Sequence, residues 1–474
     1  MSIAKLSGRV LPTMNEDGSR NWLKPRVVTG KFWHARRWVA YTLIAFFVFL
    51  PFLRINDKQA VLLDLAQRKF TIFGFIFLPT DTLLLVLVGL FLFISIITLT
   101  SILGRGWCGW ACPQTVYLEF MYRPLERLFE GTSGRGGKPA NDIPAWRFAG
   151  YFFAALLVSL IPGHTLLAYF VGTDTLAQWM HQSPFEHPSS FLIMLIATGL
   201  MMFNFYFFRE QTCLVVCPYG RFQSALIDRH SLLVSYDEKR GEPRGACTGP
   251  KQSGQALVPK GDCVDCNLCV SVCPTGIDIR KGLQMECVQC TQCIDACDSV
   301  MDKLHRPTGL IRYSSLAKNS GEPSRILRPR VIVYPILLLV LLTIWLTVFL
   351  NKPTSDVTLL RNFGNPFSIT TSGTVSNAFR IKITNRIEQA TEYRVELPGL
   401  PNAQMVLSEN PLKLEPGASR IENMMIELPT SAFTNGVLDI WVRISDGKTF
   451  SRDVACRLLG PSMKKVSNDE GVKP

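Results

Sequence analysis

The chain is poor in charged residues and in histidine. Asp, Glu, Lys and Arg make up 18% of its 474 residues, whereas proteins average about 25%. This shortage argues against a purely soluble enzyme and, together with 47% hydrophobic residues, against a disordered chain. Of only six histidines, His164 alone lies within a long apolar segment, so a haem held by two facing histidines is disfavoured.

Two signatures of other function classes are missing. No Gly-x-Gly-x-x-Gly sequence opens a helix, so we expect no nicotinamide- or flavin-binding domain. No long block of Lys or Arg occurs, although Lys and Arg number 50 against 37 Asp and Glu. We therefore assign the net charge of +13 to loops beside a membrane and expect no nucleic-acid partner.

Long apolar runs are abundant and predict transmembrane helices. Pro162 and Gly163 lie inside the third run and should kink or break that helix. The apolar run 70–79 is too short to cross a bilayer, so we expect it to be interfacial or re-entrant. The five expected spans are 38–53, 82–103, 148–171, 190–208 and 331–350.

Lys and Arg are distributed unevenly among the loops between these spans. Eight precede the first span and six lie in the loop 105–147, whereas the loop 172–189 has none. The bias predicts a cytoplasmic N-terminus and, after five crossings, a C-terminal segment outside the cytoplasm. The first apolar run follows a long polar stretch, so we expect no cleavable signal peptide and a multi-pass protein of a bacterial inner membrane.

Twelve of the fourteen cysteines lie in short, repeated spacings. Within 263–297 the pattern Cys-x2-Cys-x2-Cys-x3-Cys occurs twice, which is the spacing of bacterial ferredoxins with two clusters. Three cysteines of one motif wrap one [4Fe–4S] cluster, and the fourth ligand comes from the other motif. We therefore expect one cluster on Cys263, Cys266, Cys269 and Cys297, and the other on Cys287, Cys290, Cys293 and Cys273.

Other interpretations of these eight cysteines fit less well. Structural zinc requires two Cys-x2-Cys pairs at a wider separation, and a disulfide scaffold is typical of small secreted domains. Asp298 follows the second motif where Pro274 follows the first, which removes no ligand. Cys247 lies outside both motifs, and we expect it not to bind a cluster.

A second repeat places a Cys-x3-Cys-Pro motif directly after the second and the fourth span. Segments 114–130 and 219–234, which follow the motifs, are expected to form amphipathic surface helices. If the two spans pack together, four thiols converge at the membrane surface, and soft thiolates select Cu(I), zinc or iron–sulfur clusters. Three interpretations stay open: a copper site, a third cluster or redox disulfide pair, and buried apolar cysteines. The residues concerned are Cys108, Cys112, Cys213 and Cys217.

The C-terminal segment alternates between apolar and polar residues, as β-strands do. The alternation is clear at 379–383, 393–397, 424–428 and 438–444, with turn sequences such as Asn435-Gly436 between the runs. Short strands at this spacing predict an immunoglobulin-like sandwich. The lone Cys456 in this segment is expected to be a buried apolar residue.

The sequence thus predicts a multi-domain protein: an α-helical membrane bundle of five spans, a cytoplasmic ferredoxin-like insert with two [4Fe–4S] clusters, and a C-terminal all-β immunoglobulin-like domain. The expected boundaries are 1–37 for the cytoplasmic N-terminal segment, 38–234 for the four-span membrane domain, 235–330 for the ferredoxin-like domain, 331–350 for the fifth span and 351–474 for the periplasmic β-sandwich.

These features together resemble the cytochrome c oxidase accessory protein family of the CcoG/FixG/RdxA type, which are membrane polyferredoxins. The resemblance rests on the two Cys-x3-Cys-Pro motifs, the doubled ferredoxin motif, the flanking spans and the β-rich tail, and it covers about residues 30–460. Quinol-dehydrogenase-like iron–sulfur subunits share the order of the cysteine motifs. The fifth span and the outer β-domain favour the first family.

The resemblance implies a cupric reductase that converts Cu(II) to Cu(I) and supplies copper to cbb3-type cytochrome c oxidase. It implies that Cys108, Cys112, Cys213 and Cys217 bind copper and that the two clusters supply electrons. The implied partners are membrane lipid, copper ions, oxidase assembly factors or a copper chaperone, and an electron donor of unknown identity. Two other functions stay open: an electron relay between the quinone pool and a partner, and a non-catalytic assembly factor.

Overall fold

The protein folds as two compact units, Met1–Leu346 and Thr347–Pro474. The computed structural model describes residues 13–14, 17, 19–55, 58–66, 69–78, 81–131, 144–245, 261–323 and 327–461, except positions 363, 372, 388, 402, 434 and 449. Cys247, expected not to bind a cluster, lies outside the described residues. The ferredoxin-like segment belongs to the same compact unit as the first four apolar helices.

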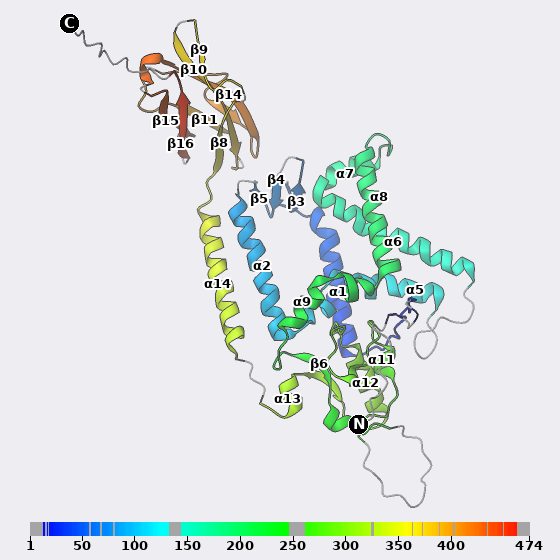
Figure 1. The fold of residues 1–474 in the computed structure, drawn as a ribbon. Coiled ribbons are helices and arrows are strands. Elements are labelled where there is room, and N and C mark those ends of the chain that lie inside the picture. Colours follow the sequence, from blue (N-terminus) through cyan, green and yellow to red (C-terminus); the bar gives the residue numbers. More distant parts are fainter. Residues whose placement is uncertain are drawn as a thin grey trace, which may run out of the picture. The chain divides into compact units, whose positions relative to one another are not determined.

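Five helices in the described part of the chain are long and apolar enough to cross a membrane (Figure 1). Many of their large apolar side chains are exposed, as expected of helices that face lipid. The spans are Lys31–Phe52, made of α1 (Lys31–Phe49) and the 3₁₀ turn η1 (Leu50–Phe52); α2 (Thr82–Leu103); α6 (Ala145–Val171); Pro188–Phe208, made of α8 (Pro188–Met202) and the π-helical turn η4 (Phe203–Phe208); and α14 (Pro329–Leu350).

The first span begins seven residues before the expected start, because a polar turn extends α1 toward the N-terminus. Its first backbone amides are bound from outside the helix: the Asp295 carboxylate accepts N–H groups of Phe32 at 3.2 Å and Trp33 at 2.7 Å. A carboxylate at a helix N-terminus satisfies free donors and complements the helix dipole. Gly30 allows this approach, since a Cβ there would lie 2.3 Å from Asp295 Cγ. The ferredoxin-like segment thus caps the first span.

The break expected in the third span does not occur, because α6 continues through Pro162 as one helix. A proline removes one backbone hydrogen bond, but neighbouring helices and side chains can compensate within membrane proteins. Here Gly163 allows α8 to approach, since a Cβ at this position would lie 2.7 Å from Thr198 Oγ1. His164 Nδ1 lies 2.9 Å from the Leu160 carbonyl oxygen of the same helix.

The loop between α1 and α2 consists of short antiparallel strands. The segment 70–79, expected to be interfacial or re-entrant, forms strands because its apolar residues pair across hairpins. The strands are β1 (Arg54–Ile55) with β2 (Lys58–Gln59), and β3 (Val61–Asp64), β4 (Lys69–Ile72) and β5 (Phe75–Phe77) in the order β3-β4-β5.

The segments after α2 and η4 repeat one arrangement, in which a short helical turn precedes a proline-initiated helix. Pro113 and Pro218 each occupy a first helical turn, where the missing N–H costs no hydrogen bond. The first copy contains α3 (Gly106–Trp110), α4 (Pro113–Tyr117), the π-helical turn η3 (Leu118–Tyr122) and α5 (Arg123–Glu130); the second contains the π-helical turn η5 (Thr212–Val216) and α9 (Pro218–Leu226); α7 (Thr173–Met180) precedes α8.

Both expected surface helices need correction. The helix expected at 219–234 ends at Leu226, and the chain continues into strand β6 (Leu233–Tyr236), which pairs with β7 (Ile311–Ser314). The helix expected at 114–130 is not a surface helix, because its charged residues are buried against other parts of the protein.

The ferredoxin-like segment contains little regular structure besides one longer helix. Its elements are α10 (Glu238–Gly241), α11 (Leu268–Ser271), the 3₁₀ turn η6 (Ile279–Lys281), α12 (Gln292–Lys303) and α13 (Leu316–Ser320). Its core joins side chains of β6, β7 and α12 with Cys263 and Cys269. The cysteines are therefore part of the packing rather than additions to a finished core.

The second unit is all β and forms two antiparallel sheets, as expected for an immunoglobulin-like sandwich. One sheet has the order β12-β14-β10-β8, with β9 beside β10, and the other has the order β13-β11-β15-β16. The strands are β8 (Ser355–Arg361), β9 (Ser368–Ile369), β10 (Thr374–Asn385), β11 (Thr391–Glu396), β12 (Gln404–Leu407), β13 (Leu412–Leu414), β14 (Ser419–Pro429), β15 (Val437–Ser445) and β16 (Ser451–Leu459), with the 3₁₀ turn η7 (Thr430–Ala432).

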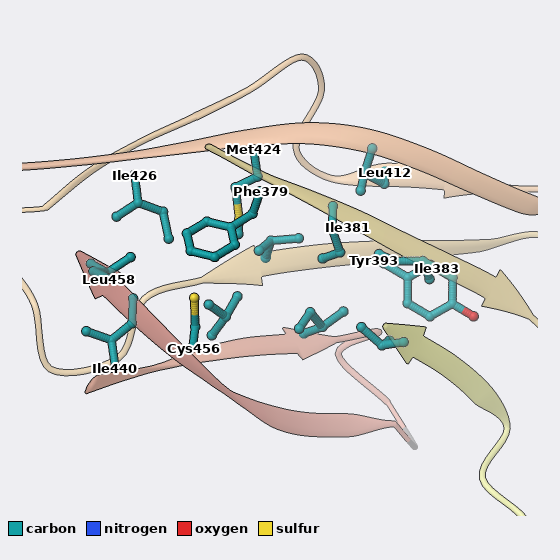
Figure 2. Packing of buried hydrophobic residues seen from close by; sticks show 14 of the residues in the cluster. Phe379, Ile381, Ile383, Tyr393, Leu412, Met424, Ile426, Ile440, Cys456 and Leu458 are labelled. Carbon is teal, nitrogen blue, oxygen red and sulfur yellow. The ribbon is translucent and has the colours of Figure 1, made fainter. Parts of the chain in front are cut away.

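Alternate residues of these strands meet between the two sheets. Figure 2 shows Phe379 and Ile381 of β10 facing Cys456 and Leu458 of β16. The Cys456 side chain is buried, and burial raises the pKa of its thiol to about 11. The expectation that Cys456 is an apolar packing residue is confirmed.

Candidate functional site

The two ferredoxin motifs share an unusual backbone conformation around their second cysteine. Asp265 and Asn267 flank Cys266 with φ of 55°, and Gln289 and Thr291 flank Cys290 with φ of 55° and 60°. Left-handed residues alternating with ordinary ones form concave backbone nests that bind anionic groups, including iron–sulfur clusters. The local geometry therefore fits the group that the cysteine spacing predicts.

The first motif, together with one cysteine of the second, lines a small cavity, here called the first cavity. Tyr236 and Arg280 line it as well. Its cysteines are Cys263, Cys266, Cys269 and Cys297, the set expected for one cluster. Cys266 is exposed, so this cavity lies close to solvent.

A separate cavity, the second cavity, lies deeper in the protein, since none of the four cysteines expected there is exposed. Its lining includes the set expected for the other cluster, Cys273, Cys287, Cys290 and Cys293, and also Cys269 of the first cavity. Because Cys269 borders both cavities, the two are neighbours. The ligand assignment stays a prediction, and both cavities are compatible with it.

Burial makes these thiols poor anions without a metal. Burial raises the pKa of Cys269, Cys290 and Cys297 to about 12 and that of Cys287 to about 11. Thiolates are the form that binds metal, so the free energy of deprotonation must come from positively charged iron. These four thiols are therefore expected to stay protonated until a cluster binds them.

Arg280 beside the first cavity is held by acidic and amide groups. Its Nε lies 2.8 Å from Asp278 Oδ1, and its terminal nitrogens lie 2.5 Å from Asp265 Oδ1 and Asn267 Oδ1. The charge of Arg280 opposes the rise in the pKa of Cys269. Two carboxylates already neutralise this cation.

The Cys-x3-Cys-Pro motifs repeat in backbone geometry as well as in sequence. Four residues before the first cysteine of each motif, Gly104 and Arg209 have nearly the same left-handed conformation, with φ of 57° and 54°. Cys112 and Cys217 are both extended and both precede a proline-initiated helix. Equivalent turns at the ends of two spans bring their thiols to the same place.

The four cysteines of these motifs form what we call the four-thiol site: Cys108, Cys112, Cys213 and Cys217. Burial raises the pKa of Cys213 to about 12, and the other three thiols add to the rise, which shows that all four lie together. No disulfide joins them. The Cys108 thiol donates to Gln223 Oε1 at 3.0 Å, and Gln223 Nε2 donates to Thr100 Oγ1 at 3.2 Å.

The described residues include no group of three or more His, Cys, Asp or Glu side chains arranged around a single metal ion. This holds for the four-thiol site and for the eight ferredoxin cysteines, which line the two cavities. Copper and a further cluster therefore both stay open for the four-thiol site.

The four-thiol site packs directly on the second cavity. A Cβ atom at Gly109, between Cys108 and Cys112, would lie 2.6 Å from the carbonyl oxygens of Val288 and Gln289. Those two residues stand between Cys287 and Cys290. Only glycine permits backbones to approach so closely. The turn that carries Cys108 and Cys112 is thus in contact with the loop that carries Cys287 and Cys290.

A buried charge network, which the sequence did not reveal, joins the same parts. Arg209 pairs with Glu126 through two contacts of 2.9 and 2.5 Å. Arg123 Nη2 donates to the Pro274 carbonyl at 3.4 Å, and Gln292 Nε2 donates to Glu119 at 3.4 Å. The signal was a charged stripe at helical spacing, which normally indicates a solvent-facing surface. Its members are Glu119, Arg123, Glu126 and Glu130.

Comparisons with known proteins agree with these observations. Family models described as a 4Fe-4S dicluster domain, a 4Fe-4S binding domain and an IG-like fold at the C-terminal of FixG match residues 208–316, 85–131 and 345–461. Protein RdxB of Cereibacter sphaeroides is 35% identical over 413 residues, which cover 82% of this chain and 84% of the relative. Nitrogen fixation protein FixG of Rhizobium meliloti is 30% identical and aligns over 92% of each chain. The chain belongs to the FixG/RdxA family.

Protein RdxA of Cereibacter sphaeroides is also similar to this FixG/RdxA chain, with 34% identity. The alignment covers 79% of this chain and 82% of RdxA. The dicluster match includes both ferredoxin motifs, which supports two iron–sulfur clusters. The match at 85–131 includes Cys108 and Cys112. This member of the family is a multi-pass membrane protein with iron–sulfur redox centres.

Proposed function

We propose that this protein is a membrane-bound oxidoreductase that reduces Cu(II) to Cu(I) at the four-thiol site, in support of copper insertion into cbb3-type cytochrome c oxidase. The observation that carries the proposal is the contact of Gly109 with the backbone between Cys287 and Cys290. Electron transfer depends on proximity, and this contact leaves no intervening layer between the two turns.

Thiol chemistry suits the product of this reaction. Soft thiolates select Cu(I), and thiol protons are released when a metal binds. Gln223 orients Cys108 from one side, and the Arg105 cation opposes the rise in the pKa of Cys108 that burial causes. Each Cu(II) takes one electron and becomes Cu(I), and the electron comes from the iron–sulfur pair, which a low-potential one-electron donor re-reduces.

We also propose the orientation of the chain. Lys and Arg gather before the first span and in the loop 105–147, and they are missing from the loop 172–189. By the positive-inside rule the N-terminus and the clusters face the cytoplasm of a bacterial cell, and the C-terminal domain lies in the periplasm.

The test uses full-length protein purified anaerobically in detergent. Protein reduced with dithionite and then freed of excess reductant receives Cu(II), and Cu(I) is measured with a chromogenic chelator. We expect about two Cu(I) per chain, one for each cluster. A variant with all four site cysteines changed to serine should lose this yield, whereas Cys456→Ala, which removes a thiol far from the site in sequence, should keep it.

Iron content decides between this proposal and a second candidate, in which the four thiols hold a further cluster. The match of residues 85–131 to a 4Fe-4S binding domain favours that candidate. Two clusters give about eight irons per chain and three give about twelve. Undiminished Cu(I) yield from the four-serine variant with eight irons would contradict the copper site, and twelve irons in the unmodified protein would favour the third cluster and an electron-relay function.

A further inference from the structure

Two buried arginines from the membrane part of the chain lie beside the loop that carries Cys287 and Cys290 of the second cavity. Arg36 of α1 has 1% of its surface exposed, and its Nε donates to the Gly109 carbonyl at 2.9 Å. Among the described atoms, its two terminal nitrogens have no hydrogen-bond partner. Arg105 is 4% exposed and donates to the Met285 carbonyl. Its Nε has no hydrogen-bond partner among the described atoms.

The charges of both arginines act on ligands of the second cavity. Arg36 donates to Gly109, whose backbone meets the carbonyl oxygens of Val288 and Gln289 between Cys287 and Cys290. Arg105 donates to Met285, two residues before Cys287. In these positions the two cations oppose the rise in the pKa of Cys290 and Cys287 that burial causes. Glu286 acts on Cys287 in the opposite direction, but less strongly than Arg105. Arg105 also acts on Cys108, so its side chain adjoins the four-thiol site as well as Met285.

The first cavity differs in its electrostatic surroundings. Its arginine, Arg280, is paired with Asp278 and Asp265, whereas neither Arg36 nor Arg105 forms an ion pair with a carboxylate in the part of the chain that the structure describes. Two cations without acidic partners therefore lie beside the ligand loop of the second cavity, while the first cavity is lined by one cation that is already neutralised.

Reduction adds a negative charge to a cluster whose ligands are already thiolates. Burial disfavours that charge, whereas a nearby cation or an N–H group directed at sulfur favours it and raises the reduction potential. We propose that Arg36 and Arg105 raise the potential of the cluster in the second cavity above that of the cluster in the first. Electrons then collect at the second cavity, next to the four-thiol site. The proposal rests on the two-cluster assignment but does not depend on copper.

The test is a redox titration followed by EPR on the purified full-length protein. Arg36→Gln and Arg105→Gln should each shift the midpoint of one cluster signal to a more negative potential and leave the other signal in place. Cys266→Ser, at the exposed edge of the first cavity, identifies the signal of the first cluster by changing its g-values. Arg229→Gln, which removes an exposed cation paired with Glu322, is the control and should move neither signal.

Iron content separates the possible failures. Eight irons per chain with unmoved midpoints in both glutamine variants, or equal shifts of both signals, would overturn the proposal. An unmodified protein with a different iron content would instead contradict the two-cluster assignment. If the glutamine variants lose iron, the unmodified protein decides: the signal that Cys266→Ser leaves unchanged should have the more positive midpoint, and the reverse order refutes the proposal.

Discussion

At the scale of single residues, the most unusual feature is the number of charges buried at the junction of the membrane helices and the ferredoxin-like segment. Glu126 and Arg209 are each 3% exposed and bind one another through both carboxylate oxygens. Burial would raise the pKa of Glu126, but the charge and hydrogen bonds of Arg209 outweigh it, and the pKa is lowered. Such a pair stabilises the fold only while both partners are present.

Removing one partner should therefore be costly. We expect Arg209→Met to lower the free energy of unfolding by about 3–5 kcal/mol at pH 7, and Arg209→Met with Glu126→Gln to recover much of the loss. Because the folded pKa of Glu126 lies below its unfolded value, its contribution is complete above that value and disappears as the pH falls through the folded pKa. The difference between variant and unmodified protein should thus hold from pH 7 down to the ordinary glutamate pKa of 4.5 and shrink as the pH falls below it.

The measurement is thermal unfolding in detergent, followed by tryptophan fluorescence. The control is Arg229→Met, whose partner Glu322 is half exposed and whose loss should cost at most about 1 kcal/mol. Equal stability losses in Arg209→Met and Arg229→Met would contradict the role given to the buried pair.

At the scale of elements, the contact between α3 and the loop 287–290 places the four-thiol site next to the second cavity. Gly109→Ala would place a Cβ 2.6 Å from two backbone oxygens, and backbone cannot move aside as a flexible side chain can. We expect a loss of stability of about 1–3 kcal/mol and a changed EPR line shape for one cluster. Gly89→Ala in α2, where a Cβ would meet nothing within 4 Å, should stay within about 1 kcal/mol of the unmodified protein. Equal stability and an unchanged EPR line shape in both variants would refute the contact.

At the scale of the whole molecule, the two units have separate cores. All members of the large β-domain cluster lie between Val357 and Leu458, and the cluster cavities are lined only by residues of the first unit. A chain ending at residue 350 should therefore keep its iron content and both EPR signals in detergent. Loss of iron on this truncation would show that the β-domain is needed for the folding of the redox unit.

The features that depend on near neighbours in the chain were predicted well. The boundaries of α2 agree with the expected 82–103, because a run of apolar residues long enough to cross a bilayer has few other uses. The strands around 379–383 and 438–444 follow from their alternation. The short spacing of the ferredoxin cysteines likewise leaves few conformations that could enclose a cluster.

Features that depend on distant partners were missed or wrong. The segment 114–130, which carries Glu119, Arg123 and Glu126, was expected to be a surface helix. Sequence alone does not show that Arg209 and the Pro274 carbonyl lie opposite these residues. The strands β4 and β5 were not expected, because an apolar run of this length suits an interfacial segment equally well. Pro162 did not end α6.

The sequence by itself determined the ingredients: five spans, two ferredoxin motifs, two Cys-x3-Cys-Pro turns and a β-rich tail, since each is encoded in a few neighbouring residues. Only the tertiary structure decided how the sulfur sites are arranged. Gly109 and Val288 lie far apart in the chain, and their contact depends on the packing of α3 against the ligand loop. Burial then makes Arg36 and Arg105 electrostatically important, because a charge acts strongly where water is excluded.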